Sequence, residues 1–333
     1  MRRLGILTLV VACSPPTTIQ DQLLADRDHH DTLAMRHHGW ELWARLSAGE
    51  WDHWTPTETL FQNETRAKPK LRTPRPFRNG GEISYERLPV MFDVLFDPHG
   101  AAHVANQQLA SRRHLDRMTD VPAFPADAIT VKLTWYAVKA HGITTMPIWD
   151  GETPQPNGNP DHTWSREIRV DPDGADGVPL ADFIYRDLDT DEEVANARIV
   201  AHDPTLARGD HIALVAAHVT TKEIPDWTWE TYWWHDAPDR GPFAEGRPDL
   251  VRGAASHYLM DVTYSADKPC FNPWLEARFP DGQASNCVTC HQRAVVGAAD
   301  YLPVTRGRLR DDDPYFRGHI QTDFLWSVAF EAR

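Results

Sequence analysis

The period of hydrophobic and polar residues changes along the chain, and this change predicts the order of its elements. Over residues 20–48 apolar residues recur at helical spacing, which predicts one or two helices. Residues 90–118 also predict a helix, most clearly over 101–118. Over 129–138 apolar and polar residues alternate, and β-branched and aromatic types dominate, which predicts a strand. We therefore expect helical structure to give way to β structure near residue 126.

Further short strands are expected between turns that are rich in Pro, Gly and Asp. They cover residues 167–170, 198–202, 211–219, 227–234 and 258–264. Closely spaced strands of this kind favour an antiparallel sheet. The pattern therefore predicts an α+β fold, with an antiparallel β-rich central body, flanking helices and a distinct C-terminal segment. The aromatic run over 227–234 is expected to form a wall of the core.

The beginning of the chain is typical of an export signal. Two arginines precede an apolar run over residues 4–12, which suits a secretory signal and is too short to span a membrane. Ala12 precedes Cys13 as in the lipobox of bacterial lipoproteins, where Cys13 would become the lipidated first residue. The alternative is ordinary cleavage nearby, which discards Cys13. Because Ser14 follows the cysteine, we expect an outer-membrane lipoprotein that faces the periplasm or the cell surface and is held by its lipid alone.

Composition narrows the class of protein. The 333 residues are 41% hydrophobic, enough for a sizeable core, whereas four cysteines are too few for a disulfide scaffold. A formal net charge of −14 argues against nucleic-acid binding, which needs a positive face. The exception is residues 66–78, where six basic residues lie among prolines. This strip either docks an acidic partner or lies along the protein's own carboxylates.

Cys287, Cys290 and His291 form a C-x-x-C-H motif, and the motif occurs once. Two thiols at this spacing on the first turn of a helix reach the two vinyl groups of one haem, and the adjacent histidine then binds the iron. Ser285 or Asn286 would cap such a helix. A following run of small apolar residues over 294–299 would continue it.

Three alternative chemistries fit this motif less well. A zinc site needs four ligands, and no second C-x-x-C is present. A thioredoxin-like pair leaves the histidine without a role, and a disulfide across two residues is strained. We therefore expect one covalently bound haem c. The remaining Cys270 is expected to be a buried small residue.

The second axial ligand of that haem is left open by the sequence. No methionine follows His291, so a downstream Met ligand is excluded. Upstream candidates are Met260, His257 and His218, and further possibilities are His235, Met146, the downstream His319, a water or no ligand. The choice matters because a Met ligand raises the reduction potential relative to a second His, whereas an open position permits ligand chemistry.

Three landmarks also carry a family resemblance. They are the strand-like segment 131–135, the Trp-x-Trp-x-Thr pattern within 227–231 and the segment 285–294 around the motif. Across roughly residues 40–300 the chain is similar to exported bacterial proteins described only as cytochrome c family proteins. The resemblance implies covalent haem on Cys287 and Cys290 with His291 as axial ligand. It brings no substrate and no reaction.

These inferences give an expected organisation and function. The expected regions are a lipoprotein signal peptide (1–12), a tether (13–25), a helical N-terminal region (26–125), a β-rich body (126–265) and a haem c-binding segment (266–333). We expect an exported monohaem cytochrome that passes single electrons to a redox partner still to be identified. A haem enzyme or gas sensor with an open sixth position is the alternative, and a haem-bearing accessory subunit is a third possibility.

Overall fold

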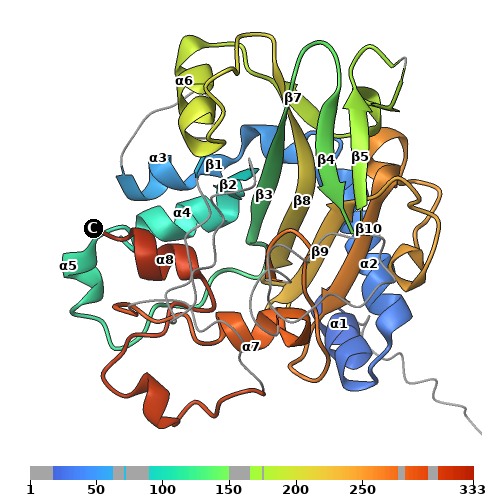
Figure 1. Ribbon diagram of the computed structural model, residues 1–333. Coiled ribbons are helices and arrows are strands. Elements are labelled where there is room, and N and C mark those ends of the chain that lie inside the picture. Colours follow the sequence, from blue (N-terminus) through green and yellow to red (C-terminus); the bar gives the residue numbers. More distant parts are fainter. Residues whose placement is uncertain are drawn as a thin grey trace, which may run out of the picture.

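The computed structural model describes residues 18–62, 71–72, 90–149, 166–174, 176–276, 282–298 and 307–333. Within these ranges a seven-stranded antiparallel sheet forms the centre of the protein (Figure 1). Its strands are β1 (Thr55–Pro56), β2 (Val90–Phe96), β3 (Ile129–Val138), β7 (Tyr185–Asp187), β8 (His211–Thr221), β9 (Thr228–Trp234) and β10 (Tyr258–Thr263). Their order is β1-β2-β3-β8-β9-β10, and β7 also pairs with β8. A smaller sheet holds β4 (Thr144–Ile148), β5 (Arg166–Asp171) and β6 (Val178–Pro179).

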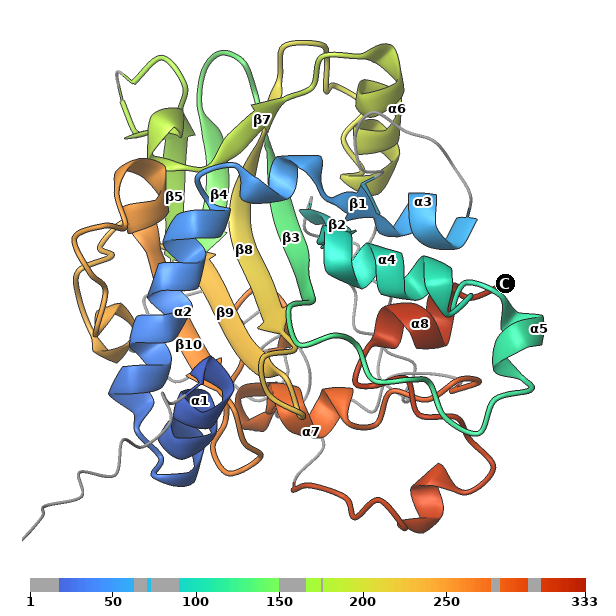
Figure 2. The ribbon, with the colours of Figure 1, turned by 180° about the vertical axis from the view of Figure 1, so that it is seen from behind.

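Helices lie around the large sheet. They are α1 (Ile19–Asp28), α2 (Thr32–Leu46), α3 (Thr57–Gln62), α4 (Pro98–Asn106), α5 (Arg112–Leu115), α6 (Asp191–Val200), α7 (Cys287–His291) and α8 (Trp326–Glu331). Figure 2 shows α1 and α2 in front of the sheet, whereas Figure 1 shows the smaller sheet on the opposite face. In both views α7 lies below the ends of β8 and β9. None of the helices in the described ranges combines the length and the apolar character needed to cross a membrane.

The two faces of the large sheet have different neighbours, and strand alternation decides which side chain meets which neighbour. Tyr232 faces α2, where its ring stacks on Trp43 at 4.3 Å. Met260 pairs with Tyr232 in the ladder and faces the same way. Trp229 and Thr231 therefore face the opposite side. This second face is the one that α7 approaches.

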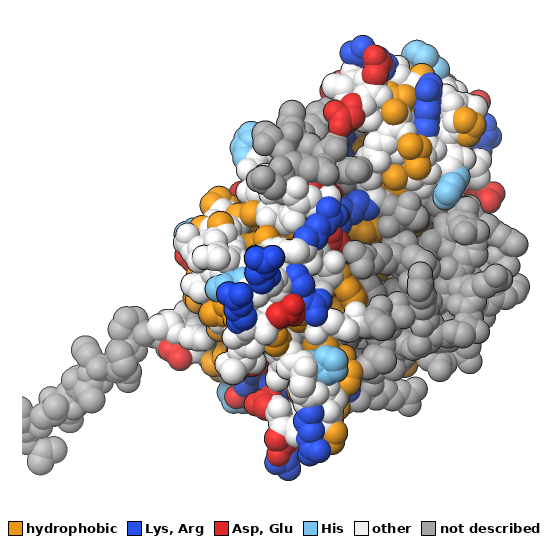
Figure 3. Space-filling model, turned by 90° about the vertical axis from the view of Figure 1, so that its left-hand side faces the viewer, with side chains coloured by type: hydrophobic (Ala, Val, Ile, Leu, Met, Phe, Trp, Pro, Cys, Tyr) orange, Lys and Arg blue, Asp and Glu red, His pale blue; other side chains and the backbone are white. Residues whose placement is uncertain are grey.

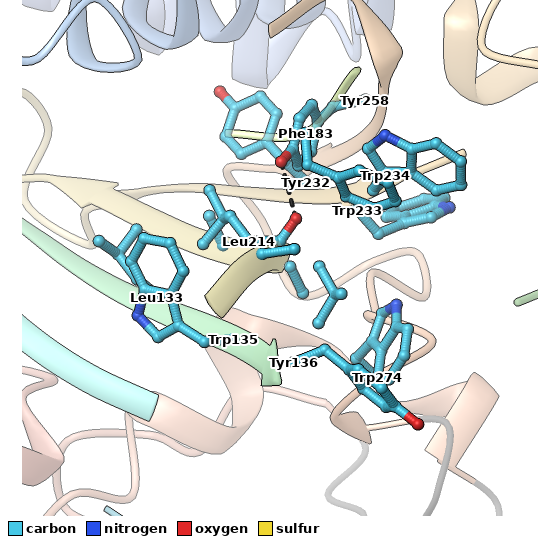
Figure 4. Close-up of a cluster of buried hydrophobic side chains, with 14 of the residues drawn as sticks. Leu133, Trp135, Tyr136, Phe183, Leu214, Tyr232, Trp233, Trp234, Tyr258 and Trp274 are labelled. Carbon is cyan, nitrogen blue, oxygen red and sulfur yellow. Dashed lines mark hydrogen bonds between the residues drawn. The ribbon is translucent and has the colours of Figure 1, made fainter. Parts of the chain in front are cut away.

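A buried aromatic core surrounds the centre of the sheet. Figure 4 shows Trp233 and Trp234 of β9 in this core with their aromatic neighbours, and all of these side chains are buried. The Tyr258 hydroxyl donates to the Leu214 carbonyl at 2.7 Å, so the buried phenol keeps a hydrogen-bond partner. Full burial of each such ring contributes roughly 2–3 kcal/mol. The prediction that the Trp-rich run walls the core is confirmed.

Much of the predicted α+β organisation is confirmed. Helices α1 and α2 lie where one or two helices were expected, and β3, β5, β8, β9 and β10 match predicted strands. The predicted tether over 13–25 was too long, because α1 begins at Ile19. Thr18 and Asp21 form a capping box there, and such a box starts a helix.

Three other local predictions were wrong. Residues 90–96 form β2 instead of a helix: this inner strand is apolar at every position except Asp93, and periodicity alone does not separate such a run from a helix. Residues 198–200 end α6 instead of forming a strand, because Thr190 and Glu193 form a capping box at its start. Residues 294–298 do not continue α7, because Val295 bridges to Gln321.

Only part of the basic strip over 66–78 lies inside the described residues. There Arg72 lies 2.5 Å from Glu58 and 2.8 Å from Glu331, so it pairs with the protein's own carboxylates. Figure 3 shows the left-hand side of the molecule, where Lys and Arg side chains lie among Asp, Glu and apolar ones.

Candidate functional site

The C-x-x-C-H motif forms the short helix α7, and Asn286 fixes where that helix begins. The Asn286 Oδ1 accepts from the Thr289 backbone N–H at 3.0 Å, which is the cap expected from the sequence. Its Nδ2 donates to the Ser265 and Lys268 carbonyls at 2.9 and 2.6 Å. One side chain therefore starts the helix and ties it to the segment that follows β10.

His291 has a defined orientation. Its Nδ1 lies 2.8 Å from the Phe324 carbonyl oxygen, which only accepts, so Nδ1 is the protonated nitrogen. Nε2 is then left with an available lone pair. The ring packs on Trp229, with ring centroids 4.2 Å apart. Burial lowers the pKa of His291 to about 4, so the imidazole is neutral at pH 7.

The thiols beside His291 are unequal. Cys287 is buried, and its Sγ lies 3.6 Å from the carbonyl oxygen and 3.7 Å from the Sγ of Cys270. Cys290 is half-buried, and burial raises the pKa of its thiol to about 12. No disulfide joins the three cysteines in the described chain. The expected burial of Cys270 is confirmed, but its contact with Cys287 was not foreseen.

Three polar side chains from the body lie close enough to the end of α7 to shift the pKa values of its residues. The set of Lys132, His218, Glu276, Cys290 and His291 is called the α7 cluster below. Its members are close enough to shift one another's pKa values: His218 and Glu276 act on His291, and Lys132 and Glu276 act on each other. All five side chains are half-buried.

His218 lacks a hydrogen bond at one nitrogen. Within the described ranges its Nε2 is buried and has no hydrogen-bond partner, and Glu276 Oε1 lies 3.5 Å away. Burial lowers the pKa of His218 to about 3 and also lowers that of Lys132, whereas it raises the pKa of Glu276. A buried polar atom without a partner is costly, so the orphaned nitrogen needs a physical reason.

Two other candidate ligands, Met260 and His257, lie away from α7. Met260 faces α2, because a Cβ added at Gly39 would lie 2.8 Å from the Met260 Sδ. His257 immediately precedes β10, six positions and about 20 Å from the position paired with Trp229. Its Nε2 is 3.6 Å from Asp182 Oδ1. Neither Met260 nor His257 approaches His291.

The remaining candidates also lie elsewhere. His235 follows β9 at the end remote from Trp229, and its Nδ1 accepts from the Ala237 N–H at 2.8 Å. Met146 is buried in β4 and packs in a different group of buried hydrophobic side chains from Trp229. His319 is exposed. Cys13 and the rest of the expected signal peptide lie outside the described residues.

Sequence reasoning missed three contributors to the site. Lys132 could have been noticed as a charged position within a strand whose neighbours are apolar. The roles of Glu276 and the Phe324 carbonyl depend on contacts between distant segments and carry no local signal. Their assembly around α7 is a property of the tertiary fold.

The residues present fit a covalently attached haem. Two thiols lie on one helical turn, the next residue offers a neutral imidazole nitrogen, and a second unpartnered imidazole nitrogen lies nearby. A bare metal ion fits less well, since the described side chains contain no group of three or more His, Cys, Asp or Glu suited to hold one.

Comparison with known proteins gave no match to a protein-family model, to a curated protein or to a solved structure. The resemblance to cytochrome c family proteins therefore stays a prediction.

Proposed function

We propose that this chain is an exported, lipid-anchored, monohaem c-type cytochrome that transfers single electrons. Cys287 and Cys290 would hold the haem through thioethers, and His291 would bind its iron. The observation that carries the proposal is the hydrogen bond of 2.8 Å from His291 Nδ1 to the Phe324 carbonyl, which leaves Nε2 available beside two thiols of the same helix.

When bound, the haem supplies an iron that gains and loses one electron. The protein's own residues supply attachment, orientation and exclusion of water. The Phe324 carbonyl holds the His291 ring and raises its basicity as a ligand. Trp229 covers one side of that ring. Lys132 and Glu276 are ionisable groups close to it, and nearby ionisable groups and burial tune a reduction potential.

Attachment is tested by producing the full chain in a Gram-negative host that matures c-type cytochromes. Haem is then measured on denatured, acid-acetone-extracted protein by a haem stain and by mass spectrometry. The wild type is expected to keep one covalent haem. The double variant Cys287→Ser, Cys290→Ser is expected to lose it.

Cys270→Ser is the matched control, because it removes a neighbouring thiol that lies outside the motif. It is expected to keep the haem. A wild-type protein without covalent haem, or a double variant that retains it, would contradict the proposal.

The lipid anchor is tested separately through Cys13→Ala, with Ser14→Ala as the control. Lipidation predicts that the Cys13 variant leaves the membrane fraction and that the Ser14 variant stays there. Unchanged membrane association of the Cys13 variant would contradict the lipid anchor, but it would not bear on the proposed haem attachment.

A further inference from the structure

The register of the large sheet places one candidate histidine beside the haem motif. His218 of β8 pairs with Thr231 of β9, and Trp229 lies two positions along the same face. Trp229 in turn packs on His291 at 4.2 Å. His218 therefore faces the side of the sheet on which α7 lies. The two imidazoles are near enough to interact electrostatically.

The same register excludes two other candidates for the second axial ligand. Met260 points to the α2 face, and the strand that carries it separates it from His291. His257 lies at the far end of β10, beside Asp182. His218 thus comes from the face and the end of the sheet that α7 contacts, whereas these two do not.

The state of His218 also points to a ligand. Its Nε2 is buried without a hydrogen-bond partner in the part of the chain that the structure describes. The nearest acidic group is the Glu276 carboxylate, whose Oε1 lies 3.5 Å from this Nε2. Its Oε2 accepts from the Asn272 N–H at 2.9 Å. Glu276 is therefore anchored at one oxygen, and a neutral imidazole nitrogen left unpaired is the form that binds a metal.

We propose that His218 is the second axial ligand of the haem iron, opposite His291. The inference rests on the proposed haem function and extends it, because it specifies a six-coordinate centre with two histidine ligands. Such a centre has no vacant position for a gas or a peroxide. It also has a lower reduction potential than a His–Met centre. Electron transfer then follows as the use of the haem, in preference to ligand sensing or catalysis.

The test compares the wild type with His218→Ala and His218→Met, all as full-length holoprotein. The wild type is expected to show low-spin ferric haem by electron paramagnetic resonance and no rapid spectral change with carbon monoxide. His218→Ala is expected to become high-spin and to bind carbon monoxide at once, and added imidazole is expected to restore the low-spin spectrum. His218→Met is expected to raise the midpoint potential.

His211→Ala is the matched control on the same strand. His211 lies at the opposite end of β8, where its Nδ1 is 2.6 Å from Asp187 Oδ1. The His211→Ala variant is expected to keep the wild-type spectrum and midpoint potential. Met260→Leu is expected to do the same, because Met260 lies on the other face.

Three results would overturn the inference: high-spin wild-type haem, a low-spin spectrum that persists in His218→Ala, or no change of potential in His218→Met. If His218→Ala does not fold, the potential of His218→Met and the wild-type spin state still decide the question. These readings are separate from the haem stain. A positive haem stain with unchanged spectra in the His218 variants would contradict the role of His218 alone. A negative stain in the wild type would contradict both the haem and its ligand.

Discussion

Glu230 lies on the face of β9 that is turned away from α7, and its charge state strongly affects the free energy of unfolding. The side chain is fully buried, and its Oε1 has no hydrogen-bond partner among the described residues. Its Oε2 accepts from the Thr228 hydroxyl at 3.2 Å. Burial, opposed by His38 and reinforced by Glu223, raises the pKa of Glu230 from 4.5 to about 8. The carboxyl is therefore protonated in the folded protein at neutral pH.

The sign of the pH dependence follows from this raised pKa. Between pH 4.5 and 8 the unfolded chain has lost the proton that the folded chain keeps, so the free energy of unfolding falls as pH rises. One pKa unit corresponds to about 1.4 kcal/mol. From pH 5 to pH 7.5 the loss due to this group is about 3 kcal/mol. Above the folded-state pKa the loss levels off.

Glu230→Gln removes this dependence, because glutamine keeps the shape of the protonated acid and has no charge to bury. We expect the variant to gain about 3 kcal/mol relative to the wild type between pH 5 and pH 7.5. The measurement is urea unfolding at both pH values, followed by tryptophan fluorescence. Glu41→Gln, at an exposed position of α2, is the control and is expected to follow the wild type. A free-energy difference between Glu230→Gln and the wild type that stays constant with pH would refute the reasoning.

Three further changes test the packing and ion pairing of the fold, each by the free energy of unfolding in urea. Arg72→Met leaves the buried Glu58 carboxylate without its cation and is expected to cost about 3–5 kcal/mol; a neutral result would show that the pair is dispensable. Gly39→Ala places a Cβ 2.8 Å from the Met260 sulfur, and overpacking of this kind is expected to cost about 1–3 kcal/mol, unless the thioether moves aside. Trp43→Ala removes a fully buried ring and is expected to cost about 3–5 kcal/mol, so a smaller loss would mean that the core collapses into the space.

The sequence predicted the parts of this fold whose signals are local. The alternation over 129–138 identified β3, and the motif at Cys287 predicted a capped helix, because both depend on residues that are near one another in the chain. The strand over 90–96 was not predicted, because it is buried on both faces and its mostly apolar run has no alternation to detect. The helix α6 did carry a local signal, the Thr190 and Glu193 capping box, which outweighed the β-branched residues near its end.

The surroundings of the motif could not be predicted in the same way. His218 was one of several possible ligands because the sequence does not specify which strand ends meet α7. That depends on the pairing of β3, β8 and β9, and on a register shift between Thr134 and Trp135 that turns later side chains to the other face. Lys132 lies in the site through the same pairing, because it is paired with His218, whereas Glu276 comes from the segment after β10.

The position of α7 also bears on why so much chain precedes the motif. The helix is short, and the rest of the α7 cluster comes from the body: Lys132 from β3, His218 from β8 and Glu276 from the segment after β10. Trp229 of β9 adds the ring that packs on His291. Whatever group His291 binds therefore meets a surface built by the large sheet. Under the proposed haem function, the body would not be a separate module attached to a haem-binding tail, since its strand register would decide which side chains face the haem and thus whether the sixth position is filled.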